Sequence, residues 1–265
     1  VSNSISREML IRRVKEPIPQ RSFVVPGSTP VISFGNLYTA RTVSIGINPS
    51  VDEFMTRHKP RRLLPGNKKR LFDFELLGLD PEEELDDQNA DRVIEGCFNY
   101  FQVNPYSWFN KLEKYVINPS GASYFDGSAA HLDLVQWATD PVWQNIPNPN
   151  IATDLIEADK EFLFELLNCG DYEEILLNGA TVVDTVLKLG LFDLCEVGKI
   201  NYPTGSSKLL LGQFKNTRVR ATTLNIPSAR GLEGPQKFAK WLRETNQQNL
   251  EHLDLLSPIV LKIDK

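Results

Sequence analysis

Strand-like and helix-like segments alternate along much of this sequence. Runs typical of β-strands lie at 30–36, 40–47, 129–139, 173–183 and 218–228. Amphipathic segments with helical spacing follow the last three of these runs, at 154–168, 180–192 and 235–246. Strands that alternate with helices of about 10–15 residues are typical of a parallel sheet covered by helices. The sequence therefore predicts a three-layer α/β/α fold with a central, mostly parallel, four-stranded sheet.

We interpret residues 1–265 as one domain, with an extended N-terminal arm over 1–30 and a helical insertion near 75–125. Hydrophobic residues make up 41% of the chain, which is enough to build a core. No apolar run approaches the roughly 20 residues of a membrane span, and the N-terminus lacks an apolar secretory segment. We therefore expect an intracellular, cytoplasmic protein.

The three cysteines are far apart and form no Cys-x-x-Cys pair: Cys97, Cys169 and Cys195. That spacing disfavours a disulfide framework, a structural zinc site and a four-cysteine iron–sulfur cluster. The formal net charge of −5 excludes a polycation, so nucleic-acid binding would need a local basic patch. We expect neither a metal ion nor another cofactor.

The segment RTVSIGINPSVDEF, residues 41–54, ends a strand-like run in a glycine and an Asn-Pro pair. Gly46 removes a Cβ and lets the backbone come close to a ligand, and Pro49 biases Asn48 toward an extended conformation. Ser50 offers a hydroxyl to a phosphate, at the start of a helix expected over 50–58. Such a tip can hold a water molecule beside a bound phosphodiester. A plain strand-to-helix turn, in which Asn48 is only a turn former, is the alternative.

A second tip, NIPSARG, follows the last strand-like run and has a similar composition. Ser228, after Pro227, would contact a second phosphate, and Arg230 would insert its long cationic side chain. The alternative is a surface turn with an exposed arginine. Ligands of parallel α/β sheets bind at the carboxyl ends of the strands. We therefore expect Asn48 and Ser228 to face each other across one cleft, to which Asp133 also belongs.

A basic segment, RHKPRRLLPGNKKR, occupies residues 57–70 directly after the first tip. It has seven Lys or Arg and one His in fourteen positions, interrupted by prolines and a glycine. We expect an irregular loop whose cations contact a nucleic-acid backbone, and the candidates are Arg61, Arg62, Lys68, Lys69 and Arg70. The alternative is a loop that is merely solvated.

The two tips, in this order, resemble the uracil-DNA glycosylase superfamily, in particular its mismatch-specific and thymine-DNA glycosylase branch. That branch reads G-I-N-P-G at the first motif and has a Pro-Ser motif at the last, followed in the thymine enzymes by further serines and an Ala-Arg pair. The matching residues are Gly46, Ile47, Asn48, Pro49, Pro227, Ser228, Ala229 and Arg230. The segments between them also resemble the family's base-reading strand (AHLDLVQWATDP), third strand with its helix (ILLNGATVV) and a further helix start (NKKRLF). The resemblance spans roughly residues 31–245.

The resemblance implies a metal-free, monofunctional DNA glycosylase with a uracil-DNA glycosylase-like fold. Asn48 would position the water that attacks C1′ of a flipped nucleotide, and Arg230 would fill the gap in the duplex. Gly46 and Ile47 would lie against the base, and Pro49 and Ser50 against a phosphate. DNA with a damaged or mismatched base is then the partner. Two alternatives stay open: a non-catalytic nucleic-acid-binding protein of the same fold, and an enzyme that acts on free nucleosides or nucleotides.

Three features depart from the family pattern. Ser50 replaces a glycine and adds a side chain beside the phosphate site. No aromatic residue aligns securely with the one that stacks on the base, because Phe54 comes early and Phe72 late. The third departure is Asp133, which stands where related enzymes carry an asparagine.

Asp133 changes the hydrogen-bonding pattern that a base would meet. An ionised Asp only accepts hydrogen bonds, so it would suit a base that presents donors, and uracil excision would be weak. A protonated Asp133 would donate instead, and a capping or ion-paired residue outside the pocket is the structural alternative. His131 lies two residues earlier on the same strand face, and it is either a donor to the base or a structural residue.

Two acidic residues, Asp52 and Glu53, follow the first tip and could serve as catalytic carboxylates near Asn48. We prefer a structural role for Glu53, because Ser50 and Glu53 have the spacing of a capping box. The aromatic residues of 100–110, and the pair Trp137 and Trp143, could stack on unpaired bases. We expect them to pack in the core instead.

Overall fold

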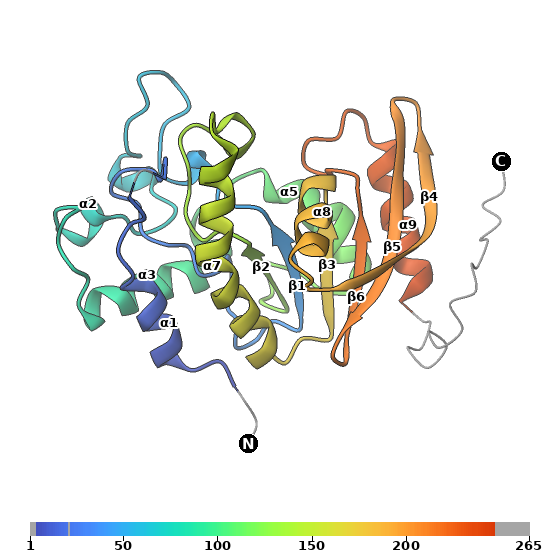
Figure 1. Ribbon diagram of the computed structural model, residues 1–265, viewed down its shortest axis with the longest axis horizontal. Coiled ribbons are helices and arrows are strands. Elements are labelled where there is room, and N and C mark those ends of the chain that lie inside the picture. The colour runs from blue at the N-terminus through green and yellow to red at the C-terminus, as the bar shows by residue number, and fades with distance from the viewer. Residues whose placement is uncertain (1–3, 21, 247–265) are drawn as a thin grey trace. The chain divides into compact units, whose positions relative to one another are not determined.

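Figure 1 shows the computed structural model, which describes residues 4–20 and 22–246 of this α/β protein. The strands are β1 (Thr42–Gly46), β2 (Ala129–Asp133), β3 (Glu174–Asn178), β4 (Asp193–Tyr202), β5 (Gly205–Phe214) and β6 (Thr217–Thr222). They form a six-stranded sheet in the order β2-β1-β3-β6-β5-β4. The α/β class is confirmed, whereas the expected number of four strands is wrong.

The parallel part of the sheet contains the strands that the sequence predicted. β1 pairs in parallel with β3, and β3 pairs in parallel with β6. Val43, Ile175 and Val219 are neighbours in this register and are fully buried. A strand that is buried on both faces carries a nearly continuous apolar run, which is why these strands can be recognised in the sequence.

Two further strands form a long antiparallel hairpin, β4–β5, whose second strand pairs antiparallel with β6 (Figure 1). β4 is the last strand in the order, and most of its residues are half-buried or exposed. An edge strand of this kind needs no apolar run, and the segment DLCEVGKINY has none. The sheet is therefore mixed, because the hairpin extends the parallel strands.

The helices agree with most of the predicted positions. Those expected at 154–168, 180–192 and 235–246 are α7 (Pro149–Cys169), α8 (Ala180–Lys188) and α9 (Glu233–Thr245). The predicted helical insertion contains α2 (Phe74–Leu77), α3 (Asp87–Phe98), α4 (Tyr100–Val103), α5 (Phe109–Leu112), a π-helical turn (Glu113–Ile117) and α6 (Asn118–Ser120). Short 3-10 turns lie at Val51–Glu53, Gly66–Lys68 and Trp143–Asn145.

Three local predictions are wrong. The segment 30–36 forms no strand, and only Phe34 pairs, with His131, in an isolated bridge. The helix expected over 50–58 ends after the 3-10 turn, because the chain folds back and Met55 pairs with Leu63. The arm over 1–30 is not extended throughout, since it contains α1 (Arg7–Val14), which Ser6 caps by accepting a hydrogen bond from the Met9 N–H.

The described residues divide into two compact units. The first unit comprises residues 4–40, 46–106 and 130–171, and the second comprises 41–45, 107–129 and 172–246. The interpretation of the chain as a single domain stays a prediction. In neither unit does the described chain contain a helix with the length and apolar character needed to cross a membrane.

A buried ion pair in the second unit joins β3, β6 and the end of α9. Arg220 on β6 is fully buried and donates from Nε and Nη2 to the Glu174 carboxylate on β3, with Nη2 at 2.7 Å from Oε2. Its Nη1 also donates to Thr245 Oγ1, at 2.7 Å. Removing the carboxylate would leave a buried guanidinium without a counter-charge, which is the costly way to break such a pair.

We expect Glu174→Gln to lower the free energy of unfolding by about 3–5 kcal/mol, because Arg220 then stays buried and unpaired. The matched control is Lys240→Gln, which removes an exposed ion pair with Glu244 and should change that free energy by less than about 1 kcal/mol. Urea denaturation followed by circular dichroism measures both. Two equally small effects would contradict the structural role of the buried pair.

Candidate active site

The chain segments that follow β1 and β2 run side by side in the first unit. The Leu134 N–H donates to the Gly46 carbonyl at 3.1 Å, and the Val135 N–H donates to the Ile47 carbonyl at 2.9 Å. The chain segment that carries Asn48 therefore runs along the segment that follows Asp133. Of the predicted site residues, Asn48 and Asp133 thus lie on neighbouring chain segments.

The side chain of Asn48 is held by the segment that follows β2. Its Nδ2 donates to the Trp137 carbonyl and to Thr139 Oγ1, both at 3.2 Å, and both partner residues are buried. With the amide nitrogen used in this way, Oδ1 is the atom that can accept a hydrogen bond. Among the described residues, none donates to it. The half-buried Asn48 is thus an oriented acceptor, as water positioning requires.

Position 46 has room only for glycine, because side chains of β2 lie where a Cβ would be. A Cβ at this position would overlap Asp133 Oδ1 and would lie 2.8 Å from His131 Nε2. The space that the missing side chain leaves is therefore filled by two side chains of β2. The glycine brings the backbone of the first tip into direct contact with the predicted base-reading residues.

Asp133 and His131 are both buried, with 4% and 2% of their surface exposed. Their side chains approach each other, with 3.4 Å between His131 Nε2 and Asp133 Oδ1, which is long for a hydrogen bond. His131 also lies against the ring of Phe34. The buried position beside Gly46 excludes a surface cap as the role of Asp133.

The capping role preferred for Glu53 is wrong. Ser50 does cap the 3-10 turn, since its hydroxyl accepts a hydrogen bond from the Asp52 N–H at 3.2 Å. The carboxylate of Glu53, however, is buried and accepts a hydrogen bond from the Tyr100 hydroxyl at 2.7 Å. Burial raises the pKa of Glu53 to about 8, so its carboxyl is neutral at pH 7.

Asp52 anchors the basic loop. Arg61 Nη1 and Arg57 Nε donate to its carboxylate at 2.9 and 3.0 Å, and the Tyr106 hydroxyl donates at 3.0 Å. Burial alone would raise the pKa of Asp52, but the bonds from Arg61, Tyr106 and Arg57 outweigh it and lower the pKa. Arg70 donates to the Asp52 carbonyl at 2.9 Å. These contacts connect the loop to the turn that follows Asn48.

The other cations of the loop differ in accessibility. Lys69 has a buried side chain, and its Nζ lies 2.5 Å from Asp73 and 2.8 Å from Glu75. An ammonium held in this way is poorly placed to bind a phosphate. Lys59, Arg62 and Lys68 are exposed and have no ion-pair partner among the residues that the structure describes. They are the cations of this loop that face solvent unpaired.

The second motif lies in the second unit. Lys111 Nζ donates to the carbonyls of Pro227 and Ala229, each at 3.2 Å, which fixes the turn. The Ser228 N–H donates to Asn225 Oδ1 at 3.3 Å. Ser228 and Arg230 are exposed. That they share one cleft with Asn48 stays a prediction.

The aromatic residues near these sites belong mainly to the core, as expected. Tyr100, Phe101, Phe109 and Trp137 are buried, and Trp143 packs against the cluster around Trp137. Tyr100 and Tyr106, which hold Glu53 and Asp52, are the participants that the sequence did not reveal. No local pattern marks them, because each is about fifty residues from its partner.

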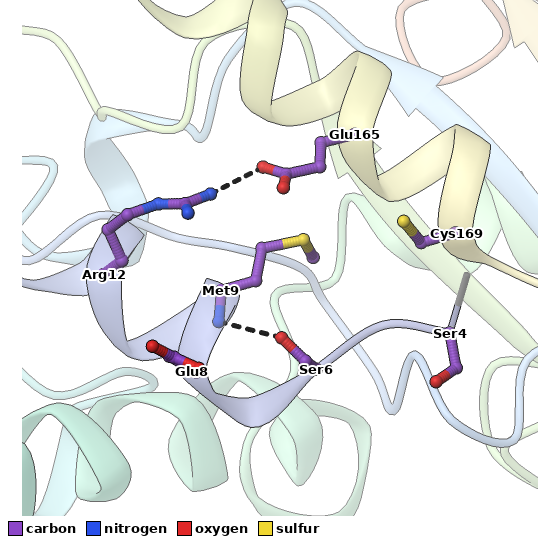
Figure 2. A pocket seen from close by; sticks show the side chains of 7 residues that line it. All are labelled: Ser4, Ser6, Glu8, Met9, Arg12, Glu165 and Cys169. Atoms are coloured by element: carbon purple, nitrogen blue, oxygen red, sulfur yellow. Dashed lines mark hydrogen bonds and ion pairs between the residues drawn. The ribbon is translucent and has the colours of Figure 1, made fainter. Parts of the chain in front are cut away.

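Figure 2 shows a cavity of about 350 Å³ in the first unit, between α1 and α7. Ser4, Ser6, Glu8, Met9, Arg12, Glu165 and Cys169 line it, and none of them is a predicted site residue. Arg12 is paired with Glu165 at 2.8 Å, so its charge is already compensated. Within the described residues, no group of three His, Cys, Asp or Glu side chains could hold a metal ion.

Comparison with known proteins assigns this chain to no family. No family model matches the sequence, and no curated protein matches it.

We expect Gly46→Ala to lower the free energy of unfolding by about 1–3 kcal/mol, because the new methyl group must displace Asp133 or His131. Gly66→Ala is the matched control, since a Cβ there meets nothing within 4 Å. Thermal and urea denaturation compare the two variants. Equal stability of Gly46→Ala and the wild type would show that the contact is not tight.

Proposed function

We propose that this protein is a monofunctional DNA-base glycosylase with a three-layer, uracil-DNA glycosylase-like fold. It would hydrolyse the N-glycosidic bond of a damaged or mismatched base that is flipped out of DNA, in an intracellular, cytoplasmic setting with access to DNA. The observation that carries the proposal is the fixed amide of Asn48, whose nitrogen is bound to Trp137 and Thr139 and whose oxygen is left to accept.

In this reaction the C1′–N bond breaks and the base leaves with its electron pair. The sugar passes through an oxocarbenium-like state, and the oxygen of a water molecule adds to C1′ while its proton passes to the departing base or to solvent. Because the sugar is then strongly electrophilic, a weak acceptor that aims the water is sufficient. Asn48 Oδ1 is proposed for this role, and the DNA phosphates add electrostatic stabilisation.

Base recognition is assigned to the buried end of β2. An ionised Asp133 accepts hydrogen bonds and therefore favours a base edge with a donor, such as an amino group or a ring N–H. Gly46 and His131 lie directly beside it. We assign the contacts with the DNA backbone to Ser50 and Ser228. Arg230 would fill the space that the flipped nucleotide leaves in the duplex.

The basic loop is proposed to bind the DNA backbone with its exposed cations. Lys59, Arg62 and Lys68 face solvent, whereas Arg57 and Arg61 are held by Asp52 and shape the loop. This division explains how a chain with a net charge of −5 could bind DNA through one segment.

We expect Asn48→Ala to lower base excision by on the order of 100-fold or more, because the attacking water loses its oriented acceptor. Oligonucleotides that carry uracil, hypoxanthine, xanthine, thymine mismatches or alkylated bases, read by alkaline strand scission, identify the substrate. Asn110→Ala, at an exposed asparagine, is the control.

DNA binding by Asn48→Ala should be retained. If the wild type binds DNA but forms no abasic product from any of these bases, the protein is a binding module and the proposed activity is wrong.

Replacing Lys59, Arg62 and Lys68 together with Gln should lower the slope of log affinity against log salt by up to about 3, since each phosphate contact contributes roughly 0.9. Lys160→Gln, an exposed lysine of α7 that pairs with Glu157, is the control and should leave the slope unchanged. Fluorescence anisotropy at several salt concentrations measures both. An unchanged slope in the triple variant would favour an enzyme that acts on free nucleotides.

A further inference from the structure

The buried face of α7 is apolar except at Asp159, which is 1% exposed. A carboxylate in the apolar interior costs free energy unless its partners replace the water that it loses. The contacts of Asp159 therefore indicate what this residue does. The other buried residues of α7, as the structure describes it, are Leu155, Phe162, Leu163, Leu166 and Leu167.

One oxygen of Asp159 is bonded to the chain segment that follows β2. Asp159 Oδ2 accepts a hydrogen bond from the Gln136 N–H at 2.7 Å. The two preceding N–H groups, those of Leu134 and Val135, donate to carbonyls of the first tip. Asp159 thus binds the next N–H group, at the point where the pairing of this segment with the first tip ends.

The other oxygen of Asp159 faces a buried cation of α1. Asp159 Oδ1 lies 2.7 Å from Nη2 of Arg13, whose side chain is 3% exposed. This ion pair lacks hydrogen-bond geometry, so the directed bond of the carboxylate is the one with Gln136. The Arg13 guanidinium also lies 5.8 Å from the centre of the Trp137 ring. Arg13 thus supplies the counter-charge, and Asp159 fixes the backbone of Gln136.

The residue after Gln136 holds the amide of Asn48. The Trp137 carbonyl is one of the two acceptors of Asn48 Nδ2. Trp137 Nε1 has no hydrogen-bond partner among the described residues, so no such bond fixes its ring. The Gln136 backbone, in contrast, is held on both sides, since its carbonyl also accepts from the Val31 N–H at 2.7 Å. A displacement of Gln136 would therefore move the acceptor that orients Asn48.

We propose that Asp159 is a positioning residue of this site. By accepting from the Gln136 N–H it places the Trp137 carbonyl, and through that carbonyl it orients the side-chain amide of Asn48. Asp159 acts through these residues and makes no contact with the substrate. Its effect on the reaction rests on the proposed glycosylase function, whereas its effect on the Asn48 amide does not.

The orientation of Asn48 is measured without reference to activity, from its two side-chain N–H signals in ¹⁵N-labelled full-length protein. Asn48→Ala lacks these signals and so identifies them. The double variant Arg13→Met/Asp159→Leu replaces both buried charges by apolar side chains, which such pairs often tolerate. Because the Gln136 N–H loses its acceptor, the Asn48 side-chain protons should exchange with solvent roughly 3- to 10-fold faster.

Arg13→Met alone is the matched variant for this measurement. It removes the same counter-charge, whereas Asp159 remains, and a carboxyl accepts through its carbonyl oxygen even when it is neutral. Methionine can also pack against the Trp137 ring. The exchange of the Asn48 protons should therefore stay at the wild-type value, as it should in Lys160→Gln, at the next residue of α7. Unchanged exchange in the folded double variant overturns the inference.

Asp159→Glu provides a second variant that keeps the charge opposite Arg13 and moves the acceptor by one methylene group. It should also shift the Asn48 side-chain signals and accelerate their exchange, because the Gln136 backbone must move. Melting temperatures establish that each variant folds. If the double variant does not fold, Asp159→Glu decides, and Asn48 signals equal to those of the wild type overturn the inference.

The effect on the reaction is measured by single-turnover excision at saturating protein, on the base that the wild type excises. The double variant should lose about 10- to 100-fold in rate with unchanged DNA affinity, because a misplacement of about 1 Å can cost that much. Arg13→Met should keep the wild-type rate. Glu174→Gln lowers stability in the second unit and should also keep it. A rate that follows the melting temperature in all variants overturns the inference.

If the wild type excises none of the bases, the proposed activity is wrong, and the exchange of the Asn48 protons decides the inference alone. Faster exchange in the double variant than in Arg13→Met supports positioning by Asp159. Equal exchange in these two variants overturns it.

Discussion

The side chains of Asp133 and His131 pack against Gly46 and determine how closely the ends of β1 and β2 approach each other. Only a residue without a Cβ lets the end of β1 approach β2 so closely. This approach permits the hydrogen bonds from Leu134 and Val135 to the first tip, and the chain then carries Trp137 and Thr139 to the Asn48 amide. The orientation of Asn48 is therefore a consequence of packing several residues away.

Charge in this region is organised by a few buried or half-buried carboxylates. Asp52 binds two arginines of the basic loop, and its first effect is to fix the shape of that loop. The cations that remain exposed supply the positive potential. Some cations of this loop thus hold its shape, and others supply exposed positive charge. The composition of the segment alone does not show which cation does which. Lys69, with its two acidic partners, belongs to the structural group.

The sequence allowed prediction of those parts whose cause is local or periodic. The parallel strands carry continuous apolar runs because both faces are buried, and the proximity of Asn48 and Asp133 follows from strands that end at one edge. β4 could not be recognised, since a half-exposed edge strand needs no such run. The Glu53–Tyr100 bond joins residues 47 positions apart, whereas the capping pattern at Ser50 and Glu53 is local and was misleading. Burial of Glu53 in the folded protein favours the long-range bond to Tyr100 over the local capping bond.

A neutral Glu53 also lowers the stability of the fold. In the unfolded chain its pKa is near 4.5, whereas in the folded protein it is about 8. Between these two pH values the folded state binds the additional proton, so this residue makes stability fall as pH rises, the reverse of a usual ion-paired carboxylate. The penalty approaches roughly 5 kcal/mol near pH 8. A glutamine would avoid it with nearly the same shape. A buried carboxyl that lowers stability in this way, five positions after Asn48, marks this part of the chain as a candidate functional region.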